Sequence, residues 1–305
     1  MLSEATTCAA PDVVRIQEQA RSHRGQRTLG GGLPVGKSRP DLGEVQETLL
    51  VPLYGRARDA TARRSILNDV RARELVGGID YDFARFSRGL LLTTVLRTSV
   101  FDAWVRGFIG GHPAGTVVEI GTGLNTRFER TDNRQVRWFD LDLPDTIELR
   151  QRFFTQTDRQ TMIAGSVFDT DWFDTVNAGP GPHLFVAEGV FAYLTETQVH
   201  GVITNLAERF PGSLIAFDTY GAKIIDKQGK ALKAVNARMQ WACDDPHMLA
   251  DWRLHLVDSH TWANPQPEAA KTWPLHYRHG IPLLARMIPG LRTYRINLFR
   301  LADTR

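Results

Sequence analysis

The chain has 305 residues, of which 42% are hydrophobic and 23% charged, which excludes a disordered chain and allows one large domain or two modest ones. The formal net charge of +3 gives no concentrated basic surface, so we expect no nucleic-acid partner. Only Cys8 and Cys243 are present, which excludes a disulfide framework and favours a reducing cytoplasm. No signal peptide and no run of 18 apolar residues occurs, so we predict a cytoplasmic protein without a membrane partner.

The beginning of the chain divides into a loose segment and a helical one. Residues 1–42 mix Gly, Pro and basic residues without periodicity, which is typical of coil, with room for a helix near residues 11–22. Residues 43–112 have a helical pattern, and apolar side chains recur at three- and four-residue steps from Leu92 to Phe108. We therefore expect one domain, residues 43–305, that opens with a helical lid.

Residues 113–222 alternate short apolar runs with longer helical stretches. This alternation predicts βαβ units, and hence an α/β fold with a mostly parallel sheet and helices on both faces. The expected strands are 116–120, 136–140, 161–164, 183–187 and 213–218, and the expected helices lie near 124–131, 145–158, 169–177 and 195–210.

The last third of the chain departs from this alternation. Residues 223–280 hold four of the seven Trp and five of the nine His, which predicts an insertion that caps the sheet. Residues 281–305 contain one more alternating strand, whose neighbour could be residues 253–258, and the sheet would then have seven strands.

The stretch "VVEIGTGLNTR", residues 117–127, places two glycines directly after an expected strand. A dinucleotide fingerprint needs a third glycine, and Thr126 stands in its place. A phosphate-binding loop fails as well, because no G-x-x-x-x-G-K-[ST] pattern occurs. The glycines Gly121 and Gly123 therefore favour a ligand that approaches the backbone closely but carries no pyrophosphate.

An acidic residue about 20 positions after the glycines indicates which ligand this is. Asp140 and Asp142 end the next expected strand, and a carboxylate there can accept two hydrogen bonds from a ribose diol. Asp142 is the better candidate, because it lies nearer the carboxyl end of its strand, where ligands bind in open parallel sheets. An adenosine without a pyrophosphate predicts S-adenosylmethionine.

Four stretches in order carry a family resemblance: "VVEIGTGLNTR", "WFDLDLPDTIELRQRF", "AEGVFAYLTETQV" and "FPGSLIAFD". They resemble the leucine carboxyl methyltransferase-like superfamily, and more closely its bacterial branch of tetracenomycin-type polyketide carboxyl O-methyltransferases. The resemblance runs from about residue 45 to 220 and fades through the aromatic-rich insertion. It implies a Rossmann-like class I methyltransferase fold with S-adenosylmethionine as cofactor.

The resemblance implies roles for further residues. An arginine matching Arg97 grips the methionine carboxylate, and a glutamate matching Glu188 contacts the cofactor, where its charge would favour the ammonium or sulfonium. Ser166 and Val167 stand where the family places the residues against the adenine. Asn125 stands where the family usually has aspartate, and we interpret it as a residue that shapes the turn, although it could instead weaken a contact with the ammonium.

The acceptor cannot be named from the sequence. We expect a carboxylate of a small aromatic or polyketide-like product, because an ionised carboxylate needs no base and no decisive base is present, while a phenol acceptor stays open. Tyr193 and Trp241 are the expected substrate-binding residues. The histidines of the insertion lack an H-E-x-x-H motif, so we expect no metal.

Two alternative functions and the oligomeric state stay open at this point. A nicotinamide oxidoreductase or a non-enzymatic binding module could use a similar sheet. The chain could be a monomer or a homodimer.

Overall fold

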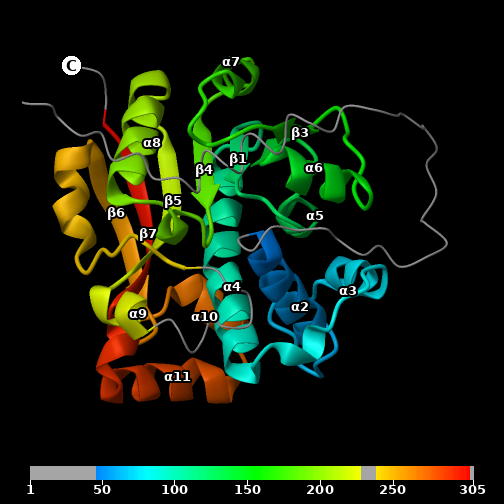
Figure 1. Cartoon of the computed structure of the whole chain (residues 1–305), viewed down its shortest axis with the longest axis vertical. Coiled ribbons are helices and arrows are strands. Elements are labelled where there is room, and N and C mark those ends of the chain that lie inside the picture. Colours follow the sequence, from blue (N-terminus) through cyan, green and yellow to red (C-terminus); the bar gives the residue numbers. More distant parts are fainter. Residues whose placement is uncertain (1–45, 228–237, 303–305) are drawn as a thin grey trace, which may run out of the picture. The chain divides into compact units, whose positions relative to one another are not determined.

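The computed structural model describes residues 46–227 and 238–302, all of which belong to one compact unit, Pro34–Arg305. The segment 1–42 and its possible helix near residues 11–22 lie outside the described residues. A seven-stranded sheet with the order β3-β2-β1-β4-β5-β7-β6 forms the centre (Figure 1). Its strands are β1 (Thr116–Ile120), β2 (Arg137–Asp142), β3 (Gln160–Ala164), β4 (His183–Ala187), β5 (Leu214–Tyr220), β6 (Leu254–Thr261) and β7 (Tyr294–Leu301).

The predicted α/β fold is confirmed. Strands β1 to β5 pair in parallel, and β7 pairs antiparallel with both β5 and β6. The helices are α2 (Leu50–Asp59), α3 (Val70–Gly77), α4 (Arg88–Gly111), α5 (Arg127–Thr131), α6 (Pro144–Gln151), α7 (Trp172–Asn177), α8 (Glu196–Arg209), α9 (Ala222–Lys227), α10 (Pro267–Thr272) and α11 (Leu275–Met287), with short 3-10 turns η1 (Gln46–Leu49), η2 (Phe83–Arg85), η3 (Phe191–Tyr193), η5 (Pro246–Trp252) and η6 (Pro289–Arg292).

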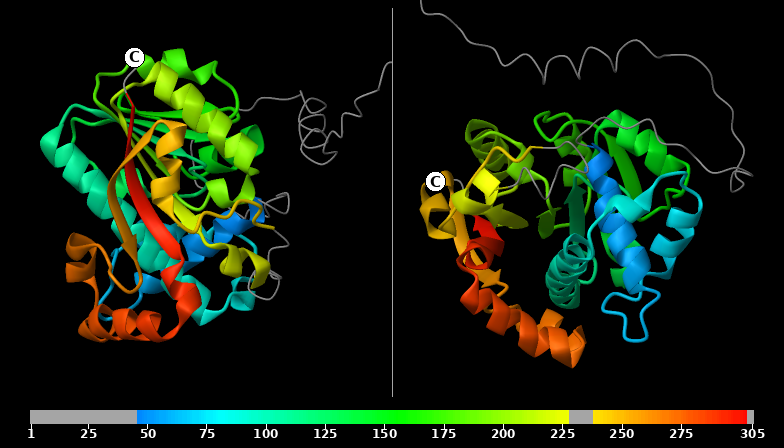
Figure 2. Two further views of the ribbon diagram at one scale, coloured as in Figure 1. Left: turned by 90° about the vertical axis from the view of Figure 1, so that its left-hand side faces the viewer. Right: turned by 60° about the horizontal axis from the view of Figure 1, so that its bottom comes forward.

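Helices cover both faces of the sheet. One face packs on apolar side chains of α4, α5 and α10, and the other packs on those of α7 and α8. The left view of Figure 2 shows the sheet running between α4 and α8. Helices α2, α3 and α6 share a third apolar cluster. Because β1 is paired on both edges and covered on both faces, all five of its residues are buried, including the polar Thr116 and Glu119, whose side chains have partners within the protein.

Two local signals fix the helices that flank the site. Ser87 caps α4 by accepting a hydrogen bond from the backbone N–H of Leu90, and the long apolar stripe of α4 then lies on the sheet. Thr195 and Gln198 form a capping box that starts α8 directly after β4 and η3. Both helices therefore begin directly after a residue whose side chain caps the first turn.

The region 223–280, which was expected to cap the sheet, contributes a strand to the sheet itself. Its residues 254–261 form β6, which completes the sheet next to β7, because the alternating sequence "LHLVDSHT" can pair along one edge. The helix expected over 145–158 is shorter, since α6 ends at Gln151. The helix expected over 124–131 begins only at Arg127, because the glycine turn extends to Thr126.

Candidate functional site

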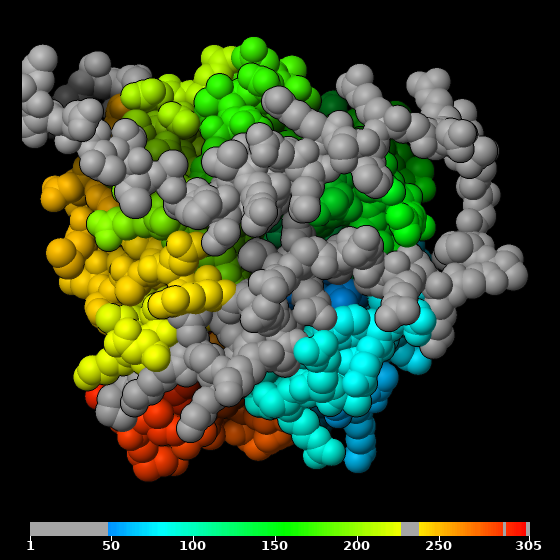
Figure 3. Space-filling model, in the orientation of Figure 1, coloured from blue at the N-terminus to red at the C-terminus, as the bar shows by residue number. Residues whose placement is uncertain are grey.

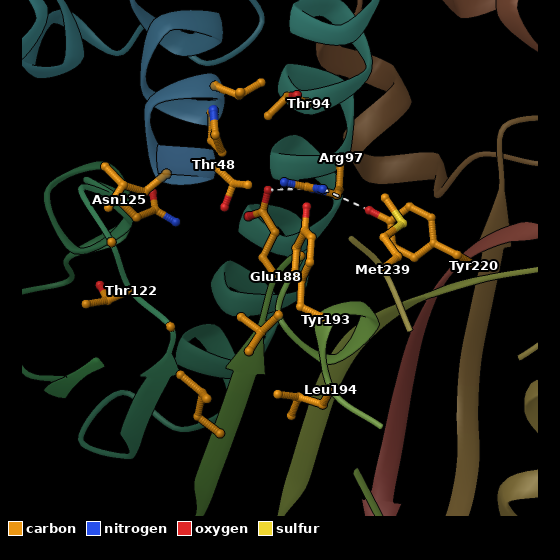
Figure 4. Close-up of a pocket in the computed structure, with 18 of the residues that line it drawn as sticks. Thr48, Thr94, Arg97, Thr122, Asn125, Glu188, Tyr193, Leu194, Tyr220 and Met239 are labelled. Carbon is orange, nitrogen blue, oxygen red and sulfur yellow. Dashed lines mark hydrogen bonds and ion pairs between the residues drawn. The ribbon is translucent and has the colours of Figure 1, made fainter. Parts of the chain in front are cut away.

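A cavity of about 1180 Å³ opens at the carboxyl ends of the parallel strands. It is lined by the turns after β1, β2, β3 and β4, by α4, and by residues after β5 (Figure 4). The predicted cofactor residues converge on it from five separate elements. Its lining includes Arg97, Gly121, Gly123, Asp142, Ser166, Val167, Glu188 and Tyr193.

The turn after β1 needs both of its glycines. Gly121 and Gly123 have φ angles of +66° and +51°, a region that side chains disfavour. A Cβ on Gly121 would also lie 2.5 Å from Cγ2 of Val190, too close for any other residue. The turn therefore presents bare backbone to the cavity.

Asp142 and Asp140 have different roles. Asp140 is fully buried and accepts hydrogen bonds from four side chains, which are Thr122, Trp138, Arg150 and Gln160. Asp142 lines the cavity, and its carboxylate accepts hydrogen bonds from the backbone N–H of Gly123 at 2.7 Å and of Leu143 at 2.8 Å. Burial raises the pKa of Asp142 to about 6. Asp140 thus supports the turn, and Asp142 is the carboxylate that a ligand can reach.

Arg97 and Glu188 both line the cavity and bind each other (Figure 4). Nε of Arg97 donates to Oε1 of Glu188 at 2.9 Å, and the same oxygen accepts from the hydroxyl of Thr98 at 2.7 Å. The other oxygen of Glu188 accepts from Arg127. Although burial would raise the pKa of Glu188, the two arginines Arg97 and Arg127 lower it below its ordinary value, so the carboxylate stays ionised.

Behind this pair lies a buried ionic cluster that the sequence reasoning missed. Arg127 is fully buried and contacts three carboxylates, those of Asp102, Glu119 and Glu188. Arg130 also binds Asp102 and reaches Asp69 at 3.0 Å. One signal could have identified Asp102, namely an acidic residue inside the apolar stripe of α4, where only a paired charge can be buried.

Asn125 belongs to the same cluster. Its amide nitrogen donates to Oε1 of Glu119 at 2.6 Å, and its amide oxygen accepts from the backbone N–H of Thr126 at 2.9 Å. Burial raises the pKa of Glu119 to about 7. An aspartate at position 125 would place a second carboxylate against Glu119, so the amide fits this site, and the Thr126 contact agrees with a turn-shaping role.

Asp218, at the end of β5, joins Arg97 to the turn after β4. It accepts hydrogen bonds from the backbone N–H of Gly189 at 2.7 Å and from the hydroxyl of Tyr294 at 3.1 Å, and lies 3.6 Å from Arg97. Gly189 has a φ of +67°, and a Cβ there would lie 3.1 Å from Nη1 of Arg97. The guanidinium is thereby held against a backbone without a side chain.

Comparison with known proteins identifies the family of this chain. The model of the leucine carboxyl methyltransferase family matches residues 45–207. The chain belongs to this family. It is 35% identical over 255 residues to the tetracenomycin polyketide synthesis O-methyltransferase TcmP of Streptomyces glaucescens, covering 81% of this chain and 93% of that protein.

Two further relatives extend the comparison. The S-adenosyl-L-methionine-dependent methyltransferase dpfgK of Gibberella zeae is 26% identical over 246 residues, covering 72% of this chain and 82% of that protein. The crystal structure of a putative methyltransferase from Thermobifida fusca has a TM-score of 0.54 at 16% identity, over 82% of this chain and 94% of that one, which shows the shared fold.

This leucine carboxyl methyltransferase family member is an S-adenosylmethionine-dependent methyltransferase. The alternatives of a nicotinamide oxidoreductase and a non-enzymatic binding module are therefore excluded. Among the residues that the structure describes, no group of three or more His, Cys, Asp and Glu side chains is placed to hold a metal ion. Within the same residues, no helix is long and apolar enough to span a bilayer.

Ser166 and Val167 both line the cavity. The hydroxyl of Ser166 accepts a hydrogen bond from the backbone N–H of Phe168 at 3.2 Å. The backbone N–H of Ser166 donates to the carboxylate of Asp169 at 3.2 Å. These bonds fix the turn after β3. Val167 packs partly buried against the apolar cluster of α7 and α8.

The expectation that Trp241 forms a wall of the acceptor pocket is wrong. Its side chain is 3% exposed and packs against Phe217 and Trp252 in the core on the α8 side of the sheet, away from the cavity lining. Residues 229–240, which precede Trp241 in the sequence, lie largely outside the described residues. Trp262, at the end of β6, lines the cavity instead and stacks on Tyr294 at 5.2 Å.

Proposed function

We propose that the protein transfers the methyl group of S-adenosylmethionine to a carboxylate of a small aromatic or polyketide-like acid. The observation that supports a carboxylate acceptor is the lack of a base. Of the described residues that line the cavity, none is a histidine, and Asp142, Glu119 and Glu188 already accept hydrogen bonds from the protein. A phenol, with a pKa near 10, would need such a base, whereas a carboxylate is ionised at pH 7.

The cofactor supplies an electrophilic methyl group on a sulfonium. We assign the ribose to Asp142, whose carboxylate can accept from two hydroxyl groups, and the sugar edge to the bare backbone of Gly121 and Gly123. The adenine lies, in this proposal, against Ser166 and Val167. Arg97 faces the methionine carboxylate with the planar donor set that such a group requires.

Glu188 contributes charge rather than a base. Its carboxylate stays ionised because two guanidinium groups bind it, and a negative charge at this position favours a bound sulfonium or ammonium. In the ionic cluster burial raises the pKa of Glu119 to about 7, and its carboxyl group lies against Arg127 and Asn125. The carboxylates of the cluster therefore favour a cationic group of the ligand, whereas Arg97 favours an anionic group.

The acceptor half of the cavity offers apolar walls and phenolic hydroxyl groups. Tyr193 and Tyr220 point toward Arg97 (Figure 4), and burial raises the pKa of Tyr193 to about 12. A tyrosine that stays protonated can donate a hydrogen bond to an acceptor carboxylate but does not remove a proton. Leu90, Ile224, Met239, Trp262 and Leu291 exclude water around the transferred methyl group.

The acceptor oxygen then attacks the methyl carbon in line with the C–S bond. The bond electrons leave with the sulfur, and a methyl ester and S-adenosylhomocysteine result. No proton needs to move, so alignment and water exclusion are the protein's contribution.

The test is a transfer assay with methyl-labelled S-adenosylmethionine over paired acceptors, each aromatic acid beside the phenol of the same ring system. We expect label in the acids, released as methanol by mild alkali, because an ester hydrolyses and an aryl ether does not. Label that resists alkali and follows the phenols would overturn the carboxylate assignment while leaving the methyltransferase in place.

A further inference from the structure

Helix α11 carries the largest concentration of exposed apolar side chains among the described residues. Eight large apolar residues are at least 43% exposed, and five of them lie on α11 or directly after it. The other three, Val70, Met248 and Val257, are far apart in the sequence. The five are Leu275 (61%), Leu283 (59%), Leu284 (47%), Met287 (66%) and Ile288 (43%).

Three of these side chains form one face of the helix. Met287 lies four residues after Leu283 and three residues after Leu284, so the three side chains lie side by side. The opposite side is occupied, because Ala285 is buried and Ile281 packs against the core cluster of α4 and α10. Figures 1 and 3 show α11 at the lower edge of the molecule, with its side chains on the surface. We call Leu283, Leu284 and Met287 the α11 face.

The charge around the α11 face has one sign. No Asp or Glu occurs between Glu268 and Asp303, whereas α11 carries the exposed Arg278 and Arg286 and the exposed histidines His276 and His279. None of these four has an acidic partner within the described residues. An apolar face beside basic side chains fits an anionic partner.

The same charges argue against a second copy of the chain. In a two-fold dimer the α11 face would meet itself, and each copy would bring Arg286 without an acid to pair it. The face is also continuous with the cavity, because Ile288 and Leu291 follow it directly and line the cavity. Whatever binds the α11 face therefore sits next to the acceptor half of the cavity.

We propose that the α11 face binds an anionic lipid surface. The helix lies in the interface, with Leu283, Leu284 and Met287 among the acyl chains and Arg286 at the headgroups. This position places the acceptor half of the cavity next to the lipid, in which apolar aromatic acids dissolve. The proposal does not depend on the identity of the acceptor.

The test uses the full chain and vesicles of phosphatidylcholine alone or with about one third phosphatidylglycerol. We expect cosedimentation with the anionic vesicles only, and weaker binding as salt is raised. The double variant Leu284→Glu with Met287→Glu should weaken binding at least about tenfold, because it removes apolar area and adds repulsion. The matched variant Met248→Glu with Val257→Glu, at two equally exposed apolar positions, should stay within about twofold.

A further change tests the charge. Arg286→Gln should reduce the preference for anionic vesicles while the affinity for S-adenosylmethionine stays unchanged. Binding to neither vesicle, or equal loss in the Met248/Val257 control, overturns the proposal. So does a lipid-free dimer, seen by light scattering, that the Leu284/Met287 variant dissociates, because a second copy would then be the occupant.

Discussion

The end of the cavity formed by the turns after β1, β2 and β4 is held by hydrogen bonds between charged groups, whereas the end formed by residues after β5 is held by apolar packing. Arg127 alone binds three carboxylates in the first half. In the second half Trp262 and Tyr294 stack on each other, and Met239 and Leu291 complete the wall. Directional bonds fix a ligand whose polar groups never vary, and apolar walls admit ligands that differ in shape.

The two halves also differ in how the chain reaches them. The residues matched by the family model end at 207, so they contain the first half and stop before β5. Most of the second half comes from described residues between 220 and 294, which precede and follow β6, and Leu90 and Tyr193 join it from earlier in the chain. A change in the first half should therefore affect stability and cofactor affinity, and a change in the second half should affect acceptor binding without affecting cofactor affinity.

The largest effect is expected for Arg127→Met. The change leaves the carboxylates of Asp102, Glu119 and Glu188 buried without their shared cation, which should cost about 3–5 kcal/mol in the free energy of unfolding. Urea unfolding at pH 7 measures it. The control is Arg209→Met, which removes an exposed ion pair with Asp174 and should cost no more than about 1 kcal/mol. Equal losses in the two variants would show that the buried cluster contributes no special stability.

The next effect separates the two aspartates of β2. Asp142→Ala should weaken S-adenosylmethionine binding by about 2–4 kcal/mol, because two charge-assisted hydrogen bonds to the ribose are lost. Asp140→Asn should instead lower stability and change affinity less, since its four partners all belong to the protein. Calorimetric titration of both variants decides it, and the opposite ranking would move the ribose site to Asp140.

The sequence predicted the first half better than the second for physical reasons. Gly121, Gly123 and Asp142 lie at fixed distances from strand ends, and parallel strands bring such ends together whatever the loops do. Arg127 and Asp102 were missed because their partnership depends on how α4 crosses the sheet, which no local pattern records. Trp241 was misplaced because an apolar aromatic residue satisfies a core and a pocket equally well. The choice between core and pocket for Trp241 depends on how η5 packs against α8, which the sequence pattern does not show.

The pH dependence of cofactor binding should be smaller. Burial raises the pKa of Asp142 from 3.8 to about 6, and ribose hydroxyl groups that donate to the carboxylate favour its ionised form. Affinity should be constant above about pH 7 and fall about tenfold for each unit below 6, because the protein must then lose a proton to bind. Asp142→Asn should flatten this part of the profile, and any slope left near pH 7 belongs to Glu119.

The stability of the ligand-free protein should change with pH in the opposite direction. Because the folded-state pKa of Asp142 exceeds the unfolded value of 3.8, the folded state binds the proton more tightly. The contribution of Asp142 to stability is therefore most favourable at low pH and declines as pH rises from about 4 to about 6. A melting temperature without ligand that rose with pH only when Asp142 was present would contradict the assigned pKa.

The smallest effect tests whether the two halves are independent. Trp262→Phe shortens a wall of the acceptor half and should raise the acceptor KM by about threefold to tenfold, or roughly 1 kcal/mol, while the Kd of S-adenosylmethionine stays within about twofold. Trp241→Phe is the matched control, because it removes the same atoms from a core position that does not line the cavity. Both variants lose packing, so both should lower the melting temperature, and only Trp262→Phe should change KM. A changed acceptor KM in Trp241→Phe would show that packing outside the cavity also controls acceptor binding. A changed cofactor Kd in Trp262→Phe would show that packing in the apolar half affects the ionic half, with which it is connected through β5. The division between a fixed cofactor site and a variable acceptor site would then not hold for this protein.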